Sequence, residues 1–166
     1  RVHASCTDAR EPETLAAALE GCDVVLSAVP YFLNPSVAAK CVSMRVGYCD
    51  LGGNTEVSAK ILALHESALH AGVTLVPDCG LAPGLGNTLA IAAMERVGAC
   101  AEIRVYCGGL PQEPEPPFHY HLVFSMEGLL NEYSGFGEVI RDGRRARVPT
   151  LEEVVELDFP GLGRLE

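Results

Sequence analysis

Residues 23–29 read D-V-V-L-S-A-V, a nearly unbroken apolar run about as long as one β-strand. A parallel strand that is covered on both faces is typically apolar at successive positions, whereas a half-exposed strand alternates between apolar and polar residues. Shorter strands are predicted on either side of this run, at residues 2–6, 48–51 and 73–76. Because the segments between them have apolar residues at helical spacing, the sequence predicts an α/β fold with a parallel sheet and right-handed crossovers.

Each of the three helices between these strands has a residue suited to its start and a glycine suited to its end. The predicted starts are Pro12, the pair Asn34-Pro35, and either Asn54 or Thr55. The predicted ends are Gly21, Gly47 and Gly72. The third helix is expected to run unbroken, because apolar residues recur at helical spacing from Val57 to Ala68.

The pattern changes after Pro83. A helix is predicted from Asn87 to Val97, followed by strands at residues 102–107 and 121–125 and by a hairpin over residues 140–148 that turns at Asp142-Gly143. Four prolines within residues 111–117 exclude a helix or a central strand there. The sequence therefore predicts two domains, a parallel-sheet domain over residues 1–80 and an α+β domain over residues 81–166.

Composition excludes several classes of protein. Of the 166 residues, 48% are hydrophobic and 20% are charged, which is typical of a globular chain. The formal net charge of -10 disfavours nucleic acid or an anionic membrane as the main partner, and no apolar run is long enough to span a bilayer. The expected partner is a small molecule.

The seven cysteines are odd in number and include no C-x-x-C pair, so buried thiols in a reduced cytoplasm fit better than disulfides or zinc. His119 and His121 would share one face of a strand, but no third metal ligand is near them in the sequence, so no metal site is predicted. Arg1 opens directly into a predicted strand, with no methionine or signal peptide before it. Either the mature protein begins here or the chain is a piece of a longer one.

Three loops rich in glycine, proline and acidic residues follow predicted strands, at residues 28–32, 50–54 and 78–84. Ligands of open parallel sheets bind beyond the carboxyl ends of the strands. Asp50, Asn54 and Asp78 offer acceptors there for an amine or hydroxyls. The alternative interpretation is three tight turns that need glycine and proline for their geometry alone.

A dinucleotide-binding turn is not complete in this sequence. Residues 84–89 read G-L-G-N-T-L, so Leu89 occupies the third glycine position of G-x-G-x-x-G. Such an imperfect match usually marks the start of a helix. If the sheet binds a dinucleotide, its phosphate-binding turn is expected outside these residues.

The three loops, in this order, resemble the saccharopine dehydrogenase-like family, and its lysine 6-dehydrogenase branch most. The matching stretches are DVVLSAVPYFLNPSVA, GYCDLGGNTEV, HAGVTLVPDCGLAPGLGN, CGGLPQEPEPP and HLVFSMEGLLNEYSG. The resemblance implies a Rossmann domain interrupted by an α+β substrate and dimerisation domain, a homodimer, NAD or NADP as cofactor, and chemistry at a C–N bond. It also implies that this chain is a middle piece, a partial Rossmann sheet without the first βα turn and an incomplete second domain, inactive by itself.

The resemblance assigns residues to roles. The cofactor-binding residues would be Ser27, Val29, Pro30, Tyr31, Leu51, Gly52, Leu81, Ala82, Pro83 and Ser125. The substrate-binding residues would be Gly52, Gly53 and Glu127, and the chemistry of the loops adds Asn54 and Asp78 as acceptors. The chemistry of an acid or base makes Asp78 and Glu127 the catalytic candidates, with bound water as a third.

Two departures from the family bear on the substrate. Saccharopine reductases have an aspartate at the position of Ala82 and an arginine at the position of Glu127. A dicarboxylate adduct would favour arginines, whereas a free ε-ammonium would favour carboxylates such as Glu127, Asp78 or Asp50. Oxidation of the lysine ε-amine to the semialdehyde is therefore expected. A saccharopine reductase or dehydrogenase, and a non-catalytic module that retains the fold, stay open as alternatives, and the gene sequence upstream of Arg1 would decide the last of these.

Overall fold

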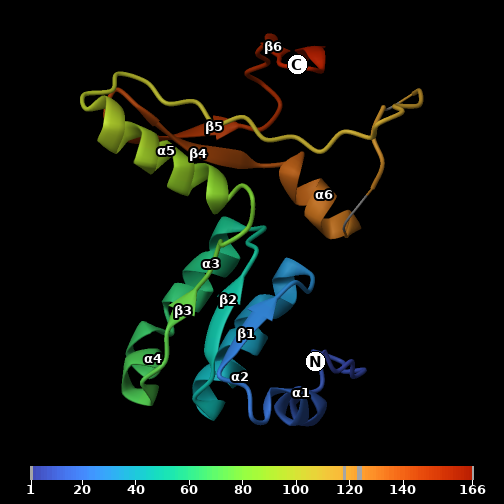
Figure 1. Cartoon of the computed structure of the whole chain (residues 1–166), viewed down its shortest axis with the longest axis vertical. Coiled ribbons are helices and arrows are strands. Elements are labelled where there is room, and N and C mark those ends of the chain that lie inside the picture. Colours follow the sequence, from blue (N-terminus) through green and yellow to red (C-terminus); the bar gives the residue numbers. More distant parts are fainter. Residues whose placement is uncertain (1, 118, 123–124, 166) are drawn as a thin grey trace. The chain divides into compact units, whose positions relative to one another are not determined.

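The computed structural model describes residues 2–117, 119–122 and 125–165 (Figure 1). The chain divides into two compact units, residues 1–121 and 122–166, and each is described by itself. The domain boundary expected near residue 80 stays a prediction.

The first unit contains a three-stranded parallel sheet in the order β1-β2-β3. The strands are β1 (Val24–Ser27), β2 (Gly47–Asp50) and β3 (Leu75–Val76). Ser27 pairs with Asp50, and Cys49 pairs with Val76, so the carboxyl ends of all three strands lie at one edge. The predicted α/β fold with a parallel sheet is confirmed.

Four α-helices connect or precede these strands. They are α1 (Pro12–Leu19), α2 (Asn34–Met44), α3 (Thr55–Leu62) and α4 (His65–Ala71), and a short 3-10 turn, η1 (Tyr31–Leu33), precedes α2. The starts predicted at Pro12 and Asn34 are confirmed, and Gly72 ends α4 with a left-handed φ of 71°.

Two helix predictions are corrected. Residues 55–71 form two helices rather than one, because the N–H of Leu64 donates to the carbonyl of Ile61, three residues back, and this tighter turn interrupts the α-helix. The helix expected to end at Gly47 ends at Met44. Arg45 adopts the left-handed backbone (φ 59°) that closes α2, and Gly47 already belongs to β2.

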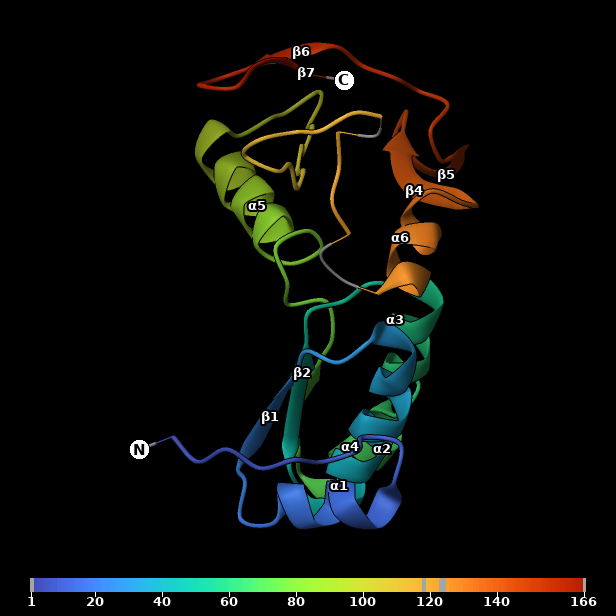
Figure 2. The same ribbon diagram turned by 90° about the vertical axis from the view of Figure 1, so that its right-hand side faces the viewer.

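The core lies between the sheet and the helices. Figure 2 shows α2, α3 and α4 on one side of β1 and β2. Tyr48 of β2 is buried there among apolar side chains that include Leu15, Val37, Cys41 and Ile61. These residues come from α1, α2 and α3, so burial of apolar surface holds each helix against the same face of the sheet.

The opposite face of this sheet is open among the described residues. Val24 and Leu26 of β1 point away from the core, and each is 62% exposed. The apolar run at residues 23–29 predicts a strand that is covered on both faces, but within the described part of the chain β1 is covered on one face and lies at the edge of the sheet. As a result, exposure alternates along β1: Val24 and Leu26 are exposed, Val25 is half-buried and Ser27 is buried.

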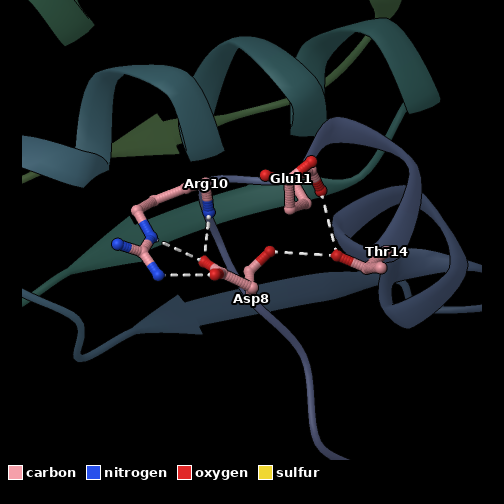
Figure 3. Close-up of polar contacts among 4 residues, drawn as sticks. All are labelled: Asp8, Arg10, Glu11 and Thr14. Atoms are coloured by element: carbon pink, nitrogen blue, oxygen red, sulfur yellow. Dashed lines mark hydrogen bonds and ion pairs between the residues drawn. The ribbon is translucent and has the colours of Figure 1, made fainter.

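The strand predicted at residues 2–6 is absent, and residues 2–7 are exposed. Alternating residues form a strand only where a neighbouring strand supplies hydrogen bonds, and none of the described residues does so here. The start of α1 is organised around Asp8 (Figure 3), whose carboxylate accepts hydrogen bonds from the backbone N–H and the guanidinium of Arg10 at 2.6–3.0 Å. These bonds lower the pKa of Asp8 to about 2. Thr14 then donates to the carbonyl of Asp8 at 3.0 Å and fixes the start of α1.

The rest of the first unit contains α5 (Leu85–Val97), which begins two residues before the predicted Asn87. No strand forms at residues 102–107, so that prediction is wrong. Ile103 and Val105 alternate as in a strand, but no neighbour pairs with them among the described residues, and both are about half exposed. His119 and His121 also lie outside any strand.

The second unit contains α6 (Met126–Glu132) and two antiparallel hairpins. The hairpin predicted near residues 140–148 is confirmed as β4 (Phe136–Arg141) and β5 (Arg144–Pro149), which turn at Asp142 and Gly143 with φ of 49° and 71°. The sequence patterns did not predict the hairpin of β6 (Leu157–Phe159) and β7 (Gly163–Leu165). A strand is also predicted at residues 121–125. Residues 121, 122 and 125 are not in a strand, and residues 123 and 124 lie outside the described residues.

No helix in the described ranges is long and apolar enough to cross a membrane. No group of three or more histidine, cysteine, aspartate or glutamate side chains in that part of the chain is arranged to hold a metal ion.

Candidate functional site

The three predicted loops meet at the carboxyl edge of the parallel sheet. The backbone of Gly53 lies against Tyr31, since a Cβ on Gly53 would be 3.0 Å from the Tyr31 Cβ. A Cβ on Gly52 would be 2.7 Å from Oδ1 of Asp78. The loop after β2 therefore contacts both of the other loops, and glycines permit these close approaches.

The loop after β1 is anchored through a buried serine. The Ser27 hydroxyl donates to Oδ1 of Asn34 at 2.7 Å, and both side chains are buried. Tyr31 is half-buried and stacks edge-on against Phe32, with ring centroids 5.9 Å apart. Val29 is half-buried and Pro30 is exposed. Ser27 thus supports the loop from beneath, while Pro30 and Tyr31 form its accessible surface.

The loop after β2 is organised by Asp50, which is only 1% exposed. Its Oδ2 accepts a hydrogen bond from the Tyr48 hydroxyl at 2.8 Å. Its Oδ1 accepts from the N–H of Gly52 at 2.7 Å and from the N–H of Asp78 at 3.0 Å. The sequence suggests Asp50 as an acceptor for an amine, but in the structure donors from the chain itself occupy this carboxylate.

Tyr48 is held in its neutral form. Burial raises the pKa of its phenol well above the usual range, and the hydrogen bond to Asp50 adds to the effect. A neutral phenol donates one hydrogen, and here that hydrogen goes to the carboxylate.

Asp78 is the half-buried carboxylate of this edge. Its backbone is left-handed (φ 62°), a conformation that is uncommon outside glycine and is adopted most often by asparagine, aspartate and histidine. The hydroxyl of Ser58, from α3, donates to its Oδ1 at 2.8 Å. The backbone N–H groups of Asp78 and Cys79 both donate to Asp50, the first to its carboxylate and the second to its carbonyl at 2.7 Å. These bonds fix where the Asp78 carboxylate lies.

Residues 80–86 form a tight turn into α5. Gly80 and Gly84 pair as an isolated bridge, the N–H of Leu85 donates to the carbonyl of Gly80, and the N–H of Gly86 donates to the carbonyl of Leu81. These N–H groups are therefore not free to hold a phosphate, which supports the interpretation of residues 84–89 as a helix start. Ala82 and Pro83 are exposed, and Leu81 is 63% exposed.

Asn54 caps α3, because its Oδ1 accepts the N–H of Val57 at 3.0 Å. It is half-buried, next to Gly53 and an exposed Leu51. Its predicted role in substrate binding stays a prediction, and the structure shows that its side chain also serves the helix.

Ser125 and Glu127 belong to the second unit. The Ser125 hydroxyl accepts the N–H of Gly128 at 3.0 Å and caps α6, while Glu127 is exposed in the first helical turn. The structure brings together the predicted site residues of the first unit. Ser125 and Glu127 belong to the second unit and are described separately. Their roles stay predictions.

Sequence reasoning missed three polar residues that support the edge: Asn34 as the partner of Ser27, Tyr48, and Ser58. One signal could have found Tyr48. Residues two apart on a strand share a face, so Tyr48 and Asp50 were bound to lie side by side. Nothing in the sequence pairs Ser58 with Asp78, which is 20 residues away.

Comparison with known proteins gives consistent matches. Residues 1–76 match the saccharopine dehydrogenase NADP binding domain, and residues 80–165 match the saccharopine dehydrogenase C-terminal domain. The mitochondrial alpha-aminoadipic semialdehyde synthase of Mus musculus is 31% identical over 95% of this chain and 18% of its own length. The saccharopine dehydrogenase [NADP(+), L-glutamate-forming] of Saccharomyces cerevisiae is 26% identical over 82% of this chain and 31% of its own length.

A solved structure shares the fold. Apo histidine-tagged saccharopine dehydrogenase (L-Glu forming) from Saccharomyces cerevisiae superposes with a TM-score of 0.62 at 24% identity, over 85% of this chain and 32% of that one. The chain thus spans less than a third of the length of each of these relatives.

The match to the NADP binding domain indicates NAD(P) as the cofactor. The residues present fit one end of that group: Leu51 and Leu81, in the loops after β2 and β3, expose apolar side chains of the kind that a flat ring such as nicotinamide packs against. In the turn into α5, the N–H groups of Leu85 and Gly86 are held by the carbonyls of Gly80 and Leu81 and do not face a pyrophosphate. With both of its halves matched, the chain belongs to the saccharopine dehydrogenase family.

Proposed function

We propose that the protein carrying this chain is an NAD(P)-dependent oxidoreductase that oxidises the ε-amine of lysine to the semialdehyde. The observation that supports this proposal most is the Asp78 carboxylate, half-buried and held by Ser58 at the edge where the three loops meet. Residues 28–32, 50–54 and 78–84 include no lysine, arginine or histidine. An edge with a carboxylate and no cation is suited to an ammonium group.

In this reaction, lysine, the oxidised cofactor and water are consumed. The products are the semialdehyde, ammonium, the reduced cofactor and one proton, so atoms and charge balance. The cofactor, when bound, accepts the hydride from the ε-carbon. The chain has to orient the amine and to accept a proton from the ammonium before the C–N bond is oxidised. Asp78 is the proposed acceptor in the first unit, and Glu127 is the second proposed carboxylate.

Saccharopine is the second candidate substrate, because the names of the relatives refer to it or to aminoadipic semialdehyde. Saccharopine carries extra carboxylates, which would need basic residues in the site. Ala82 and Glu127 stand where the family resemblance leads us to expect an aspartate and an arginine. Lysine is therefore the preferred substrate in this proposal. A homodimer and a cytoplasmic location accompany it as expectations.

The test is a substrate screen with the whole natural gene product. Reduction of NAD⁺ and NADP⁺ would be followed spectroscopically with lysine, saccharopine and ornithine, the last as a control for chain length. Turnover of lysine, with release of ammonium and a semialdehyde, is the expected result. Turnover of saccharopine with release of glutamate would favour the second candidate, and cofactor binding without any turnover would favour a non-catalytic module.

A further inference from the structure

A buried hydrogen-bond network lies directly beneath the loops after β2 and β3. It consists of Tyr48, Asp50, Gly52, Asp78 and Ser58, joined by bonds of 2.7–3.0 Å. Asp50 is at its centre, because it accepts hydrogen bonds from both loops and from Tyr48 of the strand beneath them. Within the network, the Asp50 side chain is buried and the Asp78 side chain is half-buried.

The contacts of Asp50 divide into two groups. Oδ1 holds the loops through the N–H groups of Gly52 and Asp78, while Oδ2 is held by the Tyr48 hydroxyl. The second group does not touch either loop. It orients the carboxylate so that Oδ1 lies within 3.0 Å of both amides at once. Loss of the tyrosine hydroxyl would therefore loosen the loops without removing any atom from them.

The consequence falls on Asp78. Its left-handed backbone is fixed by its own N–H and by the N–H of Cys79, and both donate to Asp50. Its carboxylate is then within 2.8 Å of the Ser58 hydroxyl, which fixes the remaining rotation. We infer that Asp50, oriented by Tyr48, is a positioning residue that aims the Asp78 carboxylate at the substrate amine, and that Asp50 is not itself a ligand of that amine. This inference rests on the proposed function, since it concerns the same site.

Asparagine separates positioning from charge. In Asp50→Asn the amide oxygen can still accept from Gly52 and Asp78, and the amide nitrogen can donate to the Tyr48 oxygen, whose own hydrogen then has to turn to another acceptor. The two loop contacts are therefore retained although the charge is lost. In Asp50→Ala both are lost. The matched control is Asp23→Asn, which removes an exposed carboxylate from the same unit.

The experiment uses the whole natural gene product and measures kcat and KM for the amine together with cofactor affinity. If Asp50 is a positioning residue, the kcat and the amine KM of Asp50→Asn and of Asp23→Asn should stay near the parent values. Asp50→Ala and Tyr48→Phe should lower kcat, by about 10- to 100-fold for the alanine variant, as expected when a reacting group is displaced, with little change in the amine KM. Equal losses in Asp50→Asn and Asp50→Ala, mainly through a raised amine KM, would make Asp50 a ligand and overturn the inference. If Asp50→Ala does not fold, the contrast between Tyr48→Phe and Asp50→Asn decides in the same way.

A second measurement does not depend on activity. Amide hydrogen exchange at Gly52 and Asp78 should accelerate in Tyr48→Phe and Asp50→Ala and stay slow in Asp50→Asn. If the parent protein turns over no amine, the proposed function fails, and the exchange pattern still tests the positioning of the loops. Unchanged exchange in both Tyr48→Phe and Asp50→Ala would overturn the inference.

Discussion

The Cα of Gly80 lies so close to the carbonyl oxygen of Leu51 that a Cβ on Gly80 would stand 2.3 Å from that oxygen. Both partners are backbone, so no side-chain movement can relieve the overlap. This contact joins the loop after β3 to the loop after β2 as directly as the hydrogen bonds of Asp50 do.

Gly80→Ala is therefore expected to lower the free energy of unfolding by about 1–3 kcal/mol, the usual cost of overpacking. The matched control is Gly109→Ala, because Gly109 has an ordinary backbone and nothing within 4 Å of the added methyl. Denaturant unfolding of the two variants measures the difference. Equal stabilities would mean that the two loops are not packed as described.

Cys41 gives a prediction about pH. Its side chain is 0% exposed, and burial raises the pKa of the thiol to about 11. An unfolded cysteine ionises near 8.5, so the folded state retains the proton over a range in which the unfolded state has lost it. The stability that depends on this difference, about 3 kcal/mol, is fully present below pH 8.5 and is lost as the pH rises from 8.5 through 11.

The measurement is the free energy of unfolding across that interval in the parent and in Cys41→Ala. The parent should lose more stability than the variant as the pH rises. Cys6→Ala, which removes an exposed thiol, serves as the control and should follow the parent. Parallel curves for the parent and Cys41→Ala would show that the thiol is accessible to solvent.

The two predicted carboxylates can be tested separately. Asp78→Asn and Glu127→Gln should each reduce kcat/KM for the amine by the equivalent of about 1.5–3 kcal/mol, the value of a hydrogen bond to a charged group, and leave cofactor affinity nearly unchanged. Glu132→Gln, another exposed glutamate of α6, is the control for Glu127. Parent-like kinetics in both variants would leave these carboxylates without a role in the reaction.

The 166-residue chain alone should self-associate and bind NAD(P) weakly. Val24 and Leu26 expose an apolar surface on β1, which has an unpaired edge in the described sheet, and such edges pair with other chains. Size-exclusion chromatography and calorimetric titration with NAD and NADP measure the two properties. Leu26→Lys should reduce the association, whereas Val97→Lys, at the C-terminal end of α5 and away from any strand edge, should reduce it less. A monomer that binds either cofactor with micromolar affinity would contradict this prediction.

Local signals predicted local structure well. Pro12 and Asn34 mark helix starts, Gly72 a helix end and Asp142-Gly143 a hairpin turn, and all four are found where expected, because capping and turn geometry depend on neighbouring residues. The strands expected at residues 2–6 and 102–107 are absent, because a strand depends on a partner that its own sequence does not specify.

For the site, too, the sequence predicts what local rules determine and not what depends on distant partners. That Asp50 and Asp78 lie at one edge follows from the rule for parallel strands, and the structure places both there. Which of them remains accessible could not be predicted. That depends on backbone N–H groups of Gly52 and Asp78 and on a tyrosine hydroxyl, whose positions exist only after the loops have folded together.

A single oxygen atom, Oδ1 of Asp50, accepts hydrogen bonds from the two loops that follow β2 and β3. The two loops therefore have to be inherited or engineered as a unit. A chimera that transplants residues 51–54 from a relative of different specificity, but keeps the native residues 77–80, would combine a new loop with a partner shaped for the old one. Exchanging both segments, together with the strand residues that hold Asp50, is the smallest graft that preserves the arrangement.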